Sequence, residues 1–138
     1  MTLRTRRALG YAVALPVSAA AAAILPLVLA TGGRVQARAG VLEAAGGILG
    51  PLLRHGNPWF PIAAITLGHV VLAADAGALE ATRAHERVHV GQYERFGFLF
   101  PVLYLASSLR AIAAGGRAYR DNAFEKEACA RSAGPAAA

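Results

Sequence analysis

Cysteine is almost absent from this chain, because Cys129 is the only one among 138 residues. A single cysteine excludes an intrachain disulfide and any metal site built from several thiolates. Charge is also scarce: only 16% of the residues are charged, whereas 56% are hydrophobic and the mean hydropathy is +0.43. The hydrophobic share and the mean hydropathy exceed those of an ordinary soluble domain, although alanine supplies much of the excess. The composition therefore favours contact with a membrane.

A motif for nucleic-acid binding is missing, although the net charge is +6. Six arginines and one glutamate lie in residues 1–60, whereas residues 61–138 hold eight basic and seven acidic residues. The basic excess thus flanks an apolar N-terminus, where it suits anionic lipid headgroups better than a DNA groove. We therefore expect no nucleic-acid partner.

The longest uncharged stretch covers residues 8–30, "ALGYAVALPVSAAAAAILPLVLA". A helix of this length, rising about 1.5 Å per residue, can cross a hydrocarbon core of about 30 Å. We expect residues 1–31 to form an uncleaved anchor that contacts membrane lipid through residues 8–30. One alternative is a signal peptide of an exported protein, cleaved near Ala30 or Ala37, where small residues stand at the required positions. The other alternative is a buried helix of a soluble domain.

Residues 32–61 are rich in glycine and proline, which predicts a connecting region. Trp59 and Phe60 within it are expected to pack in the core, with a position at a membrane interface as the alternative. The run "IAAITLGHVVLA", residues 62–73, is rich in β-branched side chains and predicts a buried strand. His69 in this run is expected to be a hydrogen-bonded core residue rather than a metal ligand.

A helix is predicted at about residues 77–95, because Asp75 can cap its N-terminus. The apolar stretch 98–109 predicts a core helix or one that lies in a membrane interface. A polar, helical segment follows it, and residues 133–138 are expected to be disordered. The sequence thus predicts an α+β fold that is mostly helical, with residues 62–132 as the domain that carries the chemistry.

His85, Glu86 and His89 form an HExxH pattern inside the predicted helix. Histidines four residues apart lie on one helix face, so both imidazoles can bind one cation. Glu86 projects about 100° away from His85, where it can reach a water held by the metal rather than the metal itself. Zinc lowers the pKa of such a water toward about 7, and the glutamate can take its remaining proton. The pattern is typical of zinc hydrolases with a glutamate as general base.

A third protein ligand must come from elsewhere in the chain. The HExxHxxGxxH class is excluded, because Gln92 and Arg95 stand where it needs glycine and histidine. Later carboxylates are Asp121, Glu125 and Glu127, which follow an apolar segment that can return the chain beside the first helix. Glu125 and Glu127 face about 200° apart on a helix, so only one can point at the metal. Spacing alone leaves both open.

Three stretches of the chain resemble a family of small, largely uncharacterised bacterial proteins that have an HExxHxxQYE helix and a later DNPFE-EA stretch. These stretches are "HERVHVGQYERFG", "PVLYL" and "YRDNAFEKEA". The pattern is also similar to gluzincin metallopeptidases, in which a second helix supplies a glutamate ligand. The resemblance covers about residues 62–130 and implies a minimal zincin-like core, Zn2+ as cofactor and a location at a bacterial inner membrane. It makes Glu125 the third ligand, with Glu127 as the alternative.

The chain departs from this family at three positions. Ala123 stands where proline is expected, Phe96 replaces tryptophan, and Cys129 replaces an aspartate or aromatic residue. Without that aspartate, one ligand histidine lacks an obvious carboxylate to orient its second ring nitrogen. Asp121 and Asn122 are the candidates for this task.

Other polar residues near the motif carry weaker expectations. Gln92 is expected to line the cleft or brace the helix, while Tyr104, Tyr119 and Arg120 are candidate donors to a tetrahedral oxyanion. The remaining charged residues of the helix are expected to form a solvated face with weak ion pairs. They are Glu80, Arg83, Arg87, Glu94 and Arg95.

The sequence therefore predicts a membrane-associated zinc metallopeptidase that hydrolyses a peptide or protein substrate. The alternative is a small membrane-associated protein that binds zinc without catalysis or is purely structural. Such a short domain has few residues that could line a substrate cleft, so the non-catalytic alternative stays open.

Overall fold

The computed structural model describes residues 1–133 and has a mixed α+β fold that is 61% helical, which confirms the predicted fold class. The predicted disordered tail lies outside the described residues, apart from Ala133. The helices are α1 (Leu3–Ala22), α2 (Leu25–Ala30), α3 (Leu49–His55), α4 (Ala76–Phe96), the 3-10 helix η1 (Gly97–Leu99), α5 (Phe100–Ala113) and α6 (Ala123–Ser132). The strands are β1 (Arg34–Arg38), β2 (Val41–Ala45), β3 (Ala64–Leu67) and β4 (Val70–Ala73).

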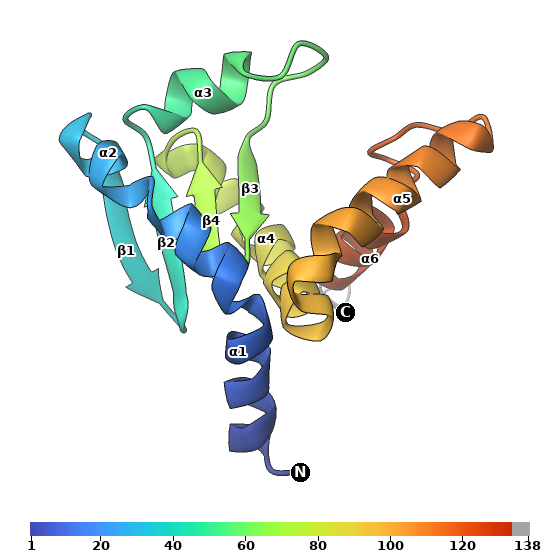
Figure 1. Cartoon of the computed structure of the whole chain (residues 1–138). Coiled ribbons are helices and arrows are strands. Elements are labelled where there is room, and N and C mark those ends of the chain that lie inside the picture. The colour runs from blue at the N-terminus through green and yellow to red at the C-terminus, as the bar shows by residue number, and fades with distance from the viewer. Residues whose placement is uncertain (134–138) are drawn as a thin grey trace, which may run out of the picture.

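The four strands form one sheet in the order β1-β2-β4-β3 (Figure 1). β1 pairs antiparallel with β2, and β3 pairs antiparallel with β4. The two hairpins are joined by a parallel pairing of β2 with β4, in which Leu42 lies opposite Val70. β3 is therefore an edge strand, paired along only one of its sides within residues 1–133.

The segment 32–61 differs from the connecting region that its composition predicted, since it supplies β1, β2 and α3. The β1–β2 turn uses Ala39 and Gly40, both with positive φ, 49° and 78°. Trp59 is 84% exposed, so the expectation that it packs in the core is wrong. Trp59 belongs to the loop between α3 and β3, which extends beyond the end of the sheet (Figure 1).

The segment 62–73 forms two short strands instead of one. Gly68 has a φ of +64° and starts a two-residue turn, which reverses the chain between β3 and β4. His69 follows in this turn, is 6% exposed and places its Nε2 2.8 Å from Oε1 of Glu94. This contact agrees with the prediction of a hydrogen-bonded core histidine.

Helices cover both faces of the sheet. Val70 and Leu72 of β4 pack against α1, α2 and α3, whereas Val71 and Ala73 point the other way toward α4. This alternation is the two-residue period of a strand that is buried on both faces. The apolar N-terminus contributes Ala21, Leu25 and Val28 to the first of these clusters. Residues 21–28 are therefore part of the core, whereas residues 1–9 are exposed.

Two helical stretches, Leu3–Ala30 and Ala76–Ala113, are long and apolar enough to cross a membrane. The first also has the place and character of a signal sequence. The second joins α4, η1 and α5, and its exposed large apolar side chains lie on η1 and α5. The length and composition of these two stretches thus agree with the prediction that the chain contacts a membrane.

Helix α4 begins where the sequence predicted, because the Asp75 carboxylate accepts a hydrogen bond from the Ala78 backbone N–H at 2.7 Å. It ends at Phe96, and Gly97, which follows, has a φ of +58°. The chain then runs outward along α5 and returns through α6, which packs against α4 (Figure 1). This return brings residues about 40 positions apart in the sequence onto neighbouring helices.

Candidate metal centre

His85, His89 and Glu125 converge from α4 and α6. The His85 Nε2 lies 3.0 Å from Oε2 of Glu125, and the His89 Nε2 lies 3.2 Å from Oε1 of the same carboxylate. The two Nε2 atoms are 3.1 Å apart. One carboxylate and two imidazoles thus present three potential ligand atoms that all lie within 4.8 Å of one another.

The chemistry of this donor set fits a divalent metal ion. Zinc is bound by imidazole nitrogen and carboxylate oxygen, and bonds of about 2.0–2.1 Å at tetrahedral angles place two ligand nitrogens about 3.3 Å apart. The observed separation of the two Nε2 atoms is close to that value. His89 and Glu125 are buried while His85 is partly exposed, so the cluster is open on one side. Three protein ligands and an open side are the arrangement of catalytic zinc sites rather than structural ones.

Glu86 is fixed by a residue of the edge strand. The Thr66 hydroxyl donates to Oε2 of Glu86 at 2.6 Å and also lies 3.2 Å from the Glu86 backbone carbonyl. The Glu86 side chain is buried, and this burial raises the pKa of its carboxyl against the lowering effects of Thr66 and the two histidines. No expectation from the sequence included Thr66. Its short polar side chain in a β-branched run was the available signal.

Glu125 is held by groups that favour its ionised form. Burial alone would raise its pKa, but hydrogen bonds with His85, His89 and Tyr104 hold the pKa of Glu125 well below its usual range. The Tyr104 hydroxyl donates to Oε1 at 2.7 Å. Tyr104 is therefore engaged with the carboxylate, which differs from its predicted use as a free oxyanion donor.

The second ring nitrogen of His89 faces Gln92. The His89 Nδ1 lies 2.7 Å from Oε1 of this amide, which is 2% exposed. Asp121 and Asn122, which the sequence offered for this task, are turned elsewhere. The Asp121 carboxylate accepts from the Arg117 backbone N–H, and the Asn122 side chain caps α6 by accepting from the Phe124 backbone N–H. Asn122 thus caps the start of α6, and Asp121 is held by the backbone of the turn that precedes it.

The second ring nitrogen of His85 has a weaker neighbour. Its Nδ1 lies 4.0 Å from Sγ of Cys129, one turn beyond Glu125 on α6. Cys129 is exposed. A thiol, and not a carboxylate, is therefore the group that faces this nitrogen.

A cavity of about 880 Å³ opens over the cluster. Its floor contains His85, Glu86, His89 and Glu125, and one wall is the edge strand β3 with the residues before it. The other walls are largely aromatic and include Phe60, Tyr93, Phe100, Tyr104 and Tyr119. Tyr119 lines this cavity with its side chain 46% exposed, and its role as an oxyanion donor stays a prediction. The cavity thus joins a polar floor to apolar walls.

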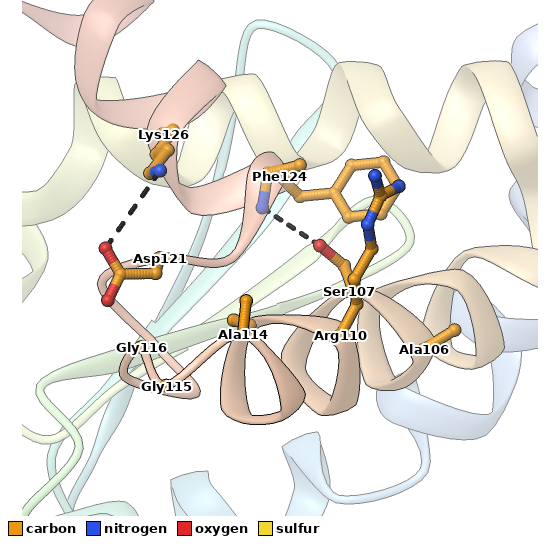
Figure 2. Close-up of a pocket in the computed structure, with 11 residues that line it drawn as sticks. Ala106, Ser107, Arg110, Ala114, Gly115, Gly116, Asp121, Phe124 and Lys126 are labelled. Carbon is orange, nitrogen blue, oxygen red and sulfur yellow. Dashed lines mark hydrogen bonds and ion pairs between the residues drawn. The ribbon is translucent and has the colours of Figure 1, made fainter.

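A second hollow, of about 840 Å³, lies between α5 and α6 and shares no lining residue with the first. Figure 2 shows that its polar side chains are Ser107, Arg110, Asp121 and Lys126. Lys126 faces Asp121 at 4.0 Å, and the Ser107 hydroxyl accepts from the Ala123 backbone N–H at 2.9 Å. These contacts stabilise the turn between α5 and α6 and the start of α6.

The expectation of a solvated charged face on α4 is wrong for two of its members. Arg83 and Arg87 reach from α4 to Glu43 on β2, which is 1% exposed, with N–O distances of 3.1 and 3.0 Å. Glu43 lies 40 or more residues from both arginines in the sequence, so no local sequence pattern predicts the contact. Glu80 keeps the predicted exposed pairing with Arg83.

Comparison of the chain with protein-family models, with curated proteins and with solved structures finds no match.

Proposed function

We propose that this chain is a membrane-associated zinc metallopeptidase related to the small bacterial family and the gluzincins that its motifs resemble. His85, His89 and Glu125 would hold Zn2+, and Glu86 would act as general base. One observation carries this proposal. Three ligand atoms from two helices converge within 4.8 Å, and Glu86 lines the same cavity. The second helix supplies a glutamate, as the gluzincin resemblance implies.

Zinc bound at these residues would supply a Lewis acid that activates water at neutral pH. Proton transfer and the orientation of the reacting groups depend on side chains of the protein. Glu86 accepts a proton from the attacking water and delivers it to the leaving amine, and its carboxylate is kept in one orientation by Thr66. Tyr104 fixes Glu125 in a similar way. Burial of both carboxylates excludes bulk water from their inner sides and strengthens these interactions.

The edge strand β3 supports a peptide as the substrate. It borders the cavity that contains Glu86, and one of its sides carries backbone groups that pair with no other described strand. An extended peptide can add to such an edge through main-chain hydrogen bonds, which places its carbonyls over the floor of the cavity. The apolar wall, including Ile65 and Phe100, favours substrates with apolar side chains on either side of the cleaved bond.

Membrane association is supported by the outer faces of the apolar helices. Large hydrophobic side chains there are more than half exposed: Leu3, Leu9, Leu15, Leu27 and Leu29 on α1 and α2, and Val102, Leu105, Leu109 and Ile112 on α5. An apolar surface of this extent is typical of lipid contact. We propose that residues 8–30 contact lipid on this face, at a bacterial inner membrane.

The packing of α2 favours an uncleaved N-terminus. Leu25 and Val28 are buried in the core, so cleavage after Ala30 would remove them. Cleavage after Ala37 would in addition cut β1. We expect the membrane fraction of producing cells to contain the chain with residues 1–30 attached, which N-terminal sequencing can read. A soluble product that begins at Thr31 or Arg38 would contradict this part of the proposal.

Metal analysis of the purified protein tests the ligand set. At saturating zinc, the wild type is expected to hold one equivalent, and His85→Ala and Glu125→Ala are expected to lose it. Glu127→Ala is the matched control, because it removes a carboxylate two residues away and should retain one equivalent. Loss of zinc in Glu127→Ala with retention in Glu125→Ala would make Glu127 the ligand and contradict the assignment.

Hydrolysis of a fluorescence-quenched peptide library tests the activity. Glu86→Gln is expected to keep its zinc and lose about 100- to 10,000-fold in rate, because it removes the general base while preserving shape. Wild-type protein with one zinc and no hydrolysis of any library member would favour the non-catalytic zinc-binding alternative. Wild-type protein without zinc would favour the purely structural one.

A further inference from the structure

Gln92 sits between the two helices that carry the proposed ligands. Its amide Oε1 lies 2.7 Å from Nδ1 of His89, one turn earlier on α4. Its Nε2 lies 3.1 Å from the Phe124 carbonyl and 2.9 Å from Oε2 of Glu127, both on α6. The side chain is almost completely buried, and three neighbours use its oxygen and both of its N–H groups.

The chemistry of these neighbours allows one orientation of the amide. A backbone carbonyl and a carboxylate can only accept hydrogen bonds, so the NH2 group of Gln92 must face Phe124 and Glu127. Its oxygen, which can only accept, is left facing His89. The Glu125 Oε1 can also accept a proton from Nε2, at 3.2 Å, but a neutral ring carries only one proton, and the shorter contact of Nδ1 with Gln92, 2.7 Å, favours that proton on Nδ1. The lone pair is then left on Nε2. This is the nitrogen that faces His85 and Glu125.

We infer that Glu127 and Gln92 are positioning residues that hold His89 in the tautomer and ring orientation needed to bind the metal. This inference rests on the proposed metal site and assigns neither residue to catalysis. Glu127 lies on the same helix as the ligand Glu125, two residues further on. The packing of α6 on α4 therefore brings the ligand Glu125 into place. Through Glu127 and Gln92 it also orients the ligand His89. A carboxylate that the sequence offered as an alternative ligand thus acts on the site through two hydrogen bonds.

The two ligand histidines differ in this respect. Nδ1 of His89 has a short contact with a buried amide, whereas the partner of His85 Nδ1 within residues 1–133 is the Cys129 sulfur at 4.0 Å. Groups that accept a hydrogen bond from the second nitrogen of a metal-bound histidine typically change metal affinity about 10- to 100-fold. The geometry assigns this contribution to metal affinity to the hydrogen bond between His89 and Gln92.

A purely structural role for Gln92 makes a different prediction. If it only joins α4 to α6, its loss lowers stability but leaves the protonated nitrogen of His89 and the zinc affinity of the folded protein unchanged. Nitrogen-resolved NMR of the histidine rings in metal-free protein, at alkaline pH where the rings are neutral, separates the two roles. We expect the wild type to carry the His89 proton on Nδ1, and Gln92→Met to shift it partly to Nε2.

Zinc affinity, measured by competition with a chromophoric chelator, completes the test. Gln92→Met is expected to weaken zinc binding about tenfold or more. Glu127→Leu should weaken it several-fold, whereas Glu127→Gln should restore it to near the wild-type value, because its amide oxygen still accepts from Gln92. Arg131→Ala is the control, since it removes only the exposed partner of Glu127 at 3.2 Å.

The outcomes are separable. A wild-type His89 proton on Nε2, or unchanged zinc affinity in folded Gln92→Met, overturns the inference while the zinc site stands. Absence of zinc from the wild type overturns the proposed function together with the positioning role. If Gln92→Met does not fold, the Glu127→Leu and Glu127→Gln pair decides, because Glu127 is only partly buried. Equal zinc affinity in that pair overturns the inference.

Discussion

The Thr66 hydroxyl donates to the Glu86 carboxylate across 2.6 Å, which links the edge strand of the sheet to the proposed general base. Both residues are buried, with exposed fractions of 6% and 5%. The strand that is proposed to bind substrate therefore also orients the group proposed to act on it.

Replacement of Thr66 by valine tests this link. Thr66→Val keeps the volume and leaves the buried carboxylate without its donor, so we expect the free energy of unfolding to fall by about 1–3 kcal/mol. Urea denaturation followed by circular dichroism measures the change. Thr66→Ser, which keeps the hydroxyl, is the control and should remain closer to the wild type in both stability and hydrolysis. Equal stability of the valine and serine variants would show that the hydrogen bond contributes nothing.

Cys129 offers a gain-of-affinity test at the other histidine. A carboxylate accepts a hydrogen bond from an imidazole N–H more strongly than a thiol does. Because the Cys129 sulfur lies 4.0 Å from Nδ1 of His85, Cys129→Asp is expected to tighten zinc binding about tenfold. Cys129→Ala removes the sulfur without adding a charge and should stay within a few-fold of the wild type. Zinc affinity in the aspartate variant no higher than in the alanine variant would contradict the proposed orientation of His85.

The parts of the fold that were predictable are those with local signals. Asp75 marks the start of α4, and the spacing of His85 and His89 places both on one face of it, which needs no knowledge of the rest of the chain. The HExxH spacing and the later glutamates similarly predicted the cluster that the structure brings together. The choice of Glu125 over Glu127 needed the family resemblance, because both stand on one helix.

The sheet was harder to predict. Hairpins of the β1–β2 type usually carry Asn-Gly or Asp-Gly at the turn, whereas here Ala39 takes the first positive-φ position, which alanine rarely occupies. In the second hairpin Gly68 was a usable signal, but the apolar run around it looks continuous. The parallel pairing of β2 with β4 joins residues 28 positions apart, such as Leu42 and Val70, and depends on the crossover through α3. No local pattern encodes such a contact.

The role of the apolar N-terminus in the core leads to a third prediction. Val28 is fully buried against the sheet, whereas its neighbour Leu27 is 51% exposed. In detergent, Val28→Ala is expected to lower the free energy of unfolding by about 2 kcal/mol, because it leaves a cavity beside the sheet. Leu27→Ala should change it by less than about 0.5 kcal/mol. Similar small effects in both variants would indicate that α2 is not docked on the domain.

Glu43 carries the last prediction, because it is the most buried acid described and its partners come from α4 and β1. Arg83, Arg87 and Gln36 all donate to its carboxylate. Burial alone would raise its pKa, but these hydrogen bonds outweigh burial and hold the pKa of Glu43 below its ordinary value of 4.5. A lowered pKa means that the folded state binds its proton less readily than the unfolded state does. The stability that Glu43 contributes is therefore present above pH 4.5 and is lost as the pH falls through the lower pKa of the folded protein.

Glu43→Gln is accordingly expected to lower the free energy of unfolding at pH 7 by about 2 kcal/mol, the scale of hydrogen bonds to a charged group. It should also make the decline in stability between pH 5 and pH 3 shallower than in the wild type. Urea denaturation at a series of pH values measures both effects. Glu80→Gln is the matched control, since Glu80 pairs with the same Arg83 but is exposed, and it should change stability by less than about 1 kcal/mol. A Glu43→Gln curve parallel to the wild-type curve would mean that this carboxylate is not a source of the acid sensitivity. The two arginines would then serve only to pack α4 on the sheet.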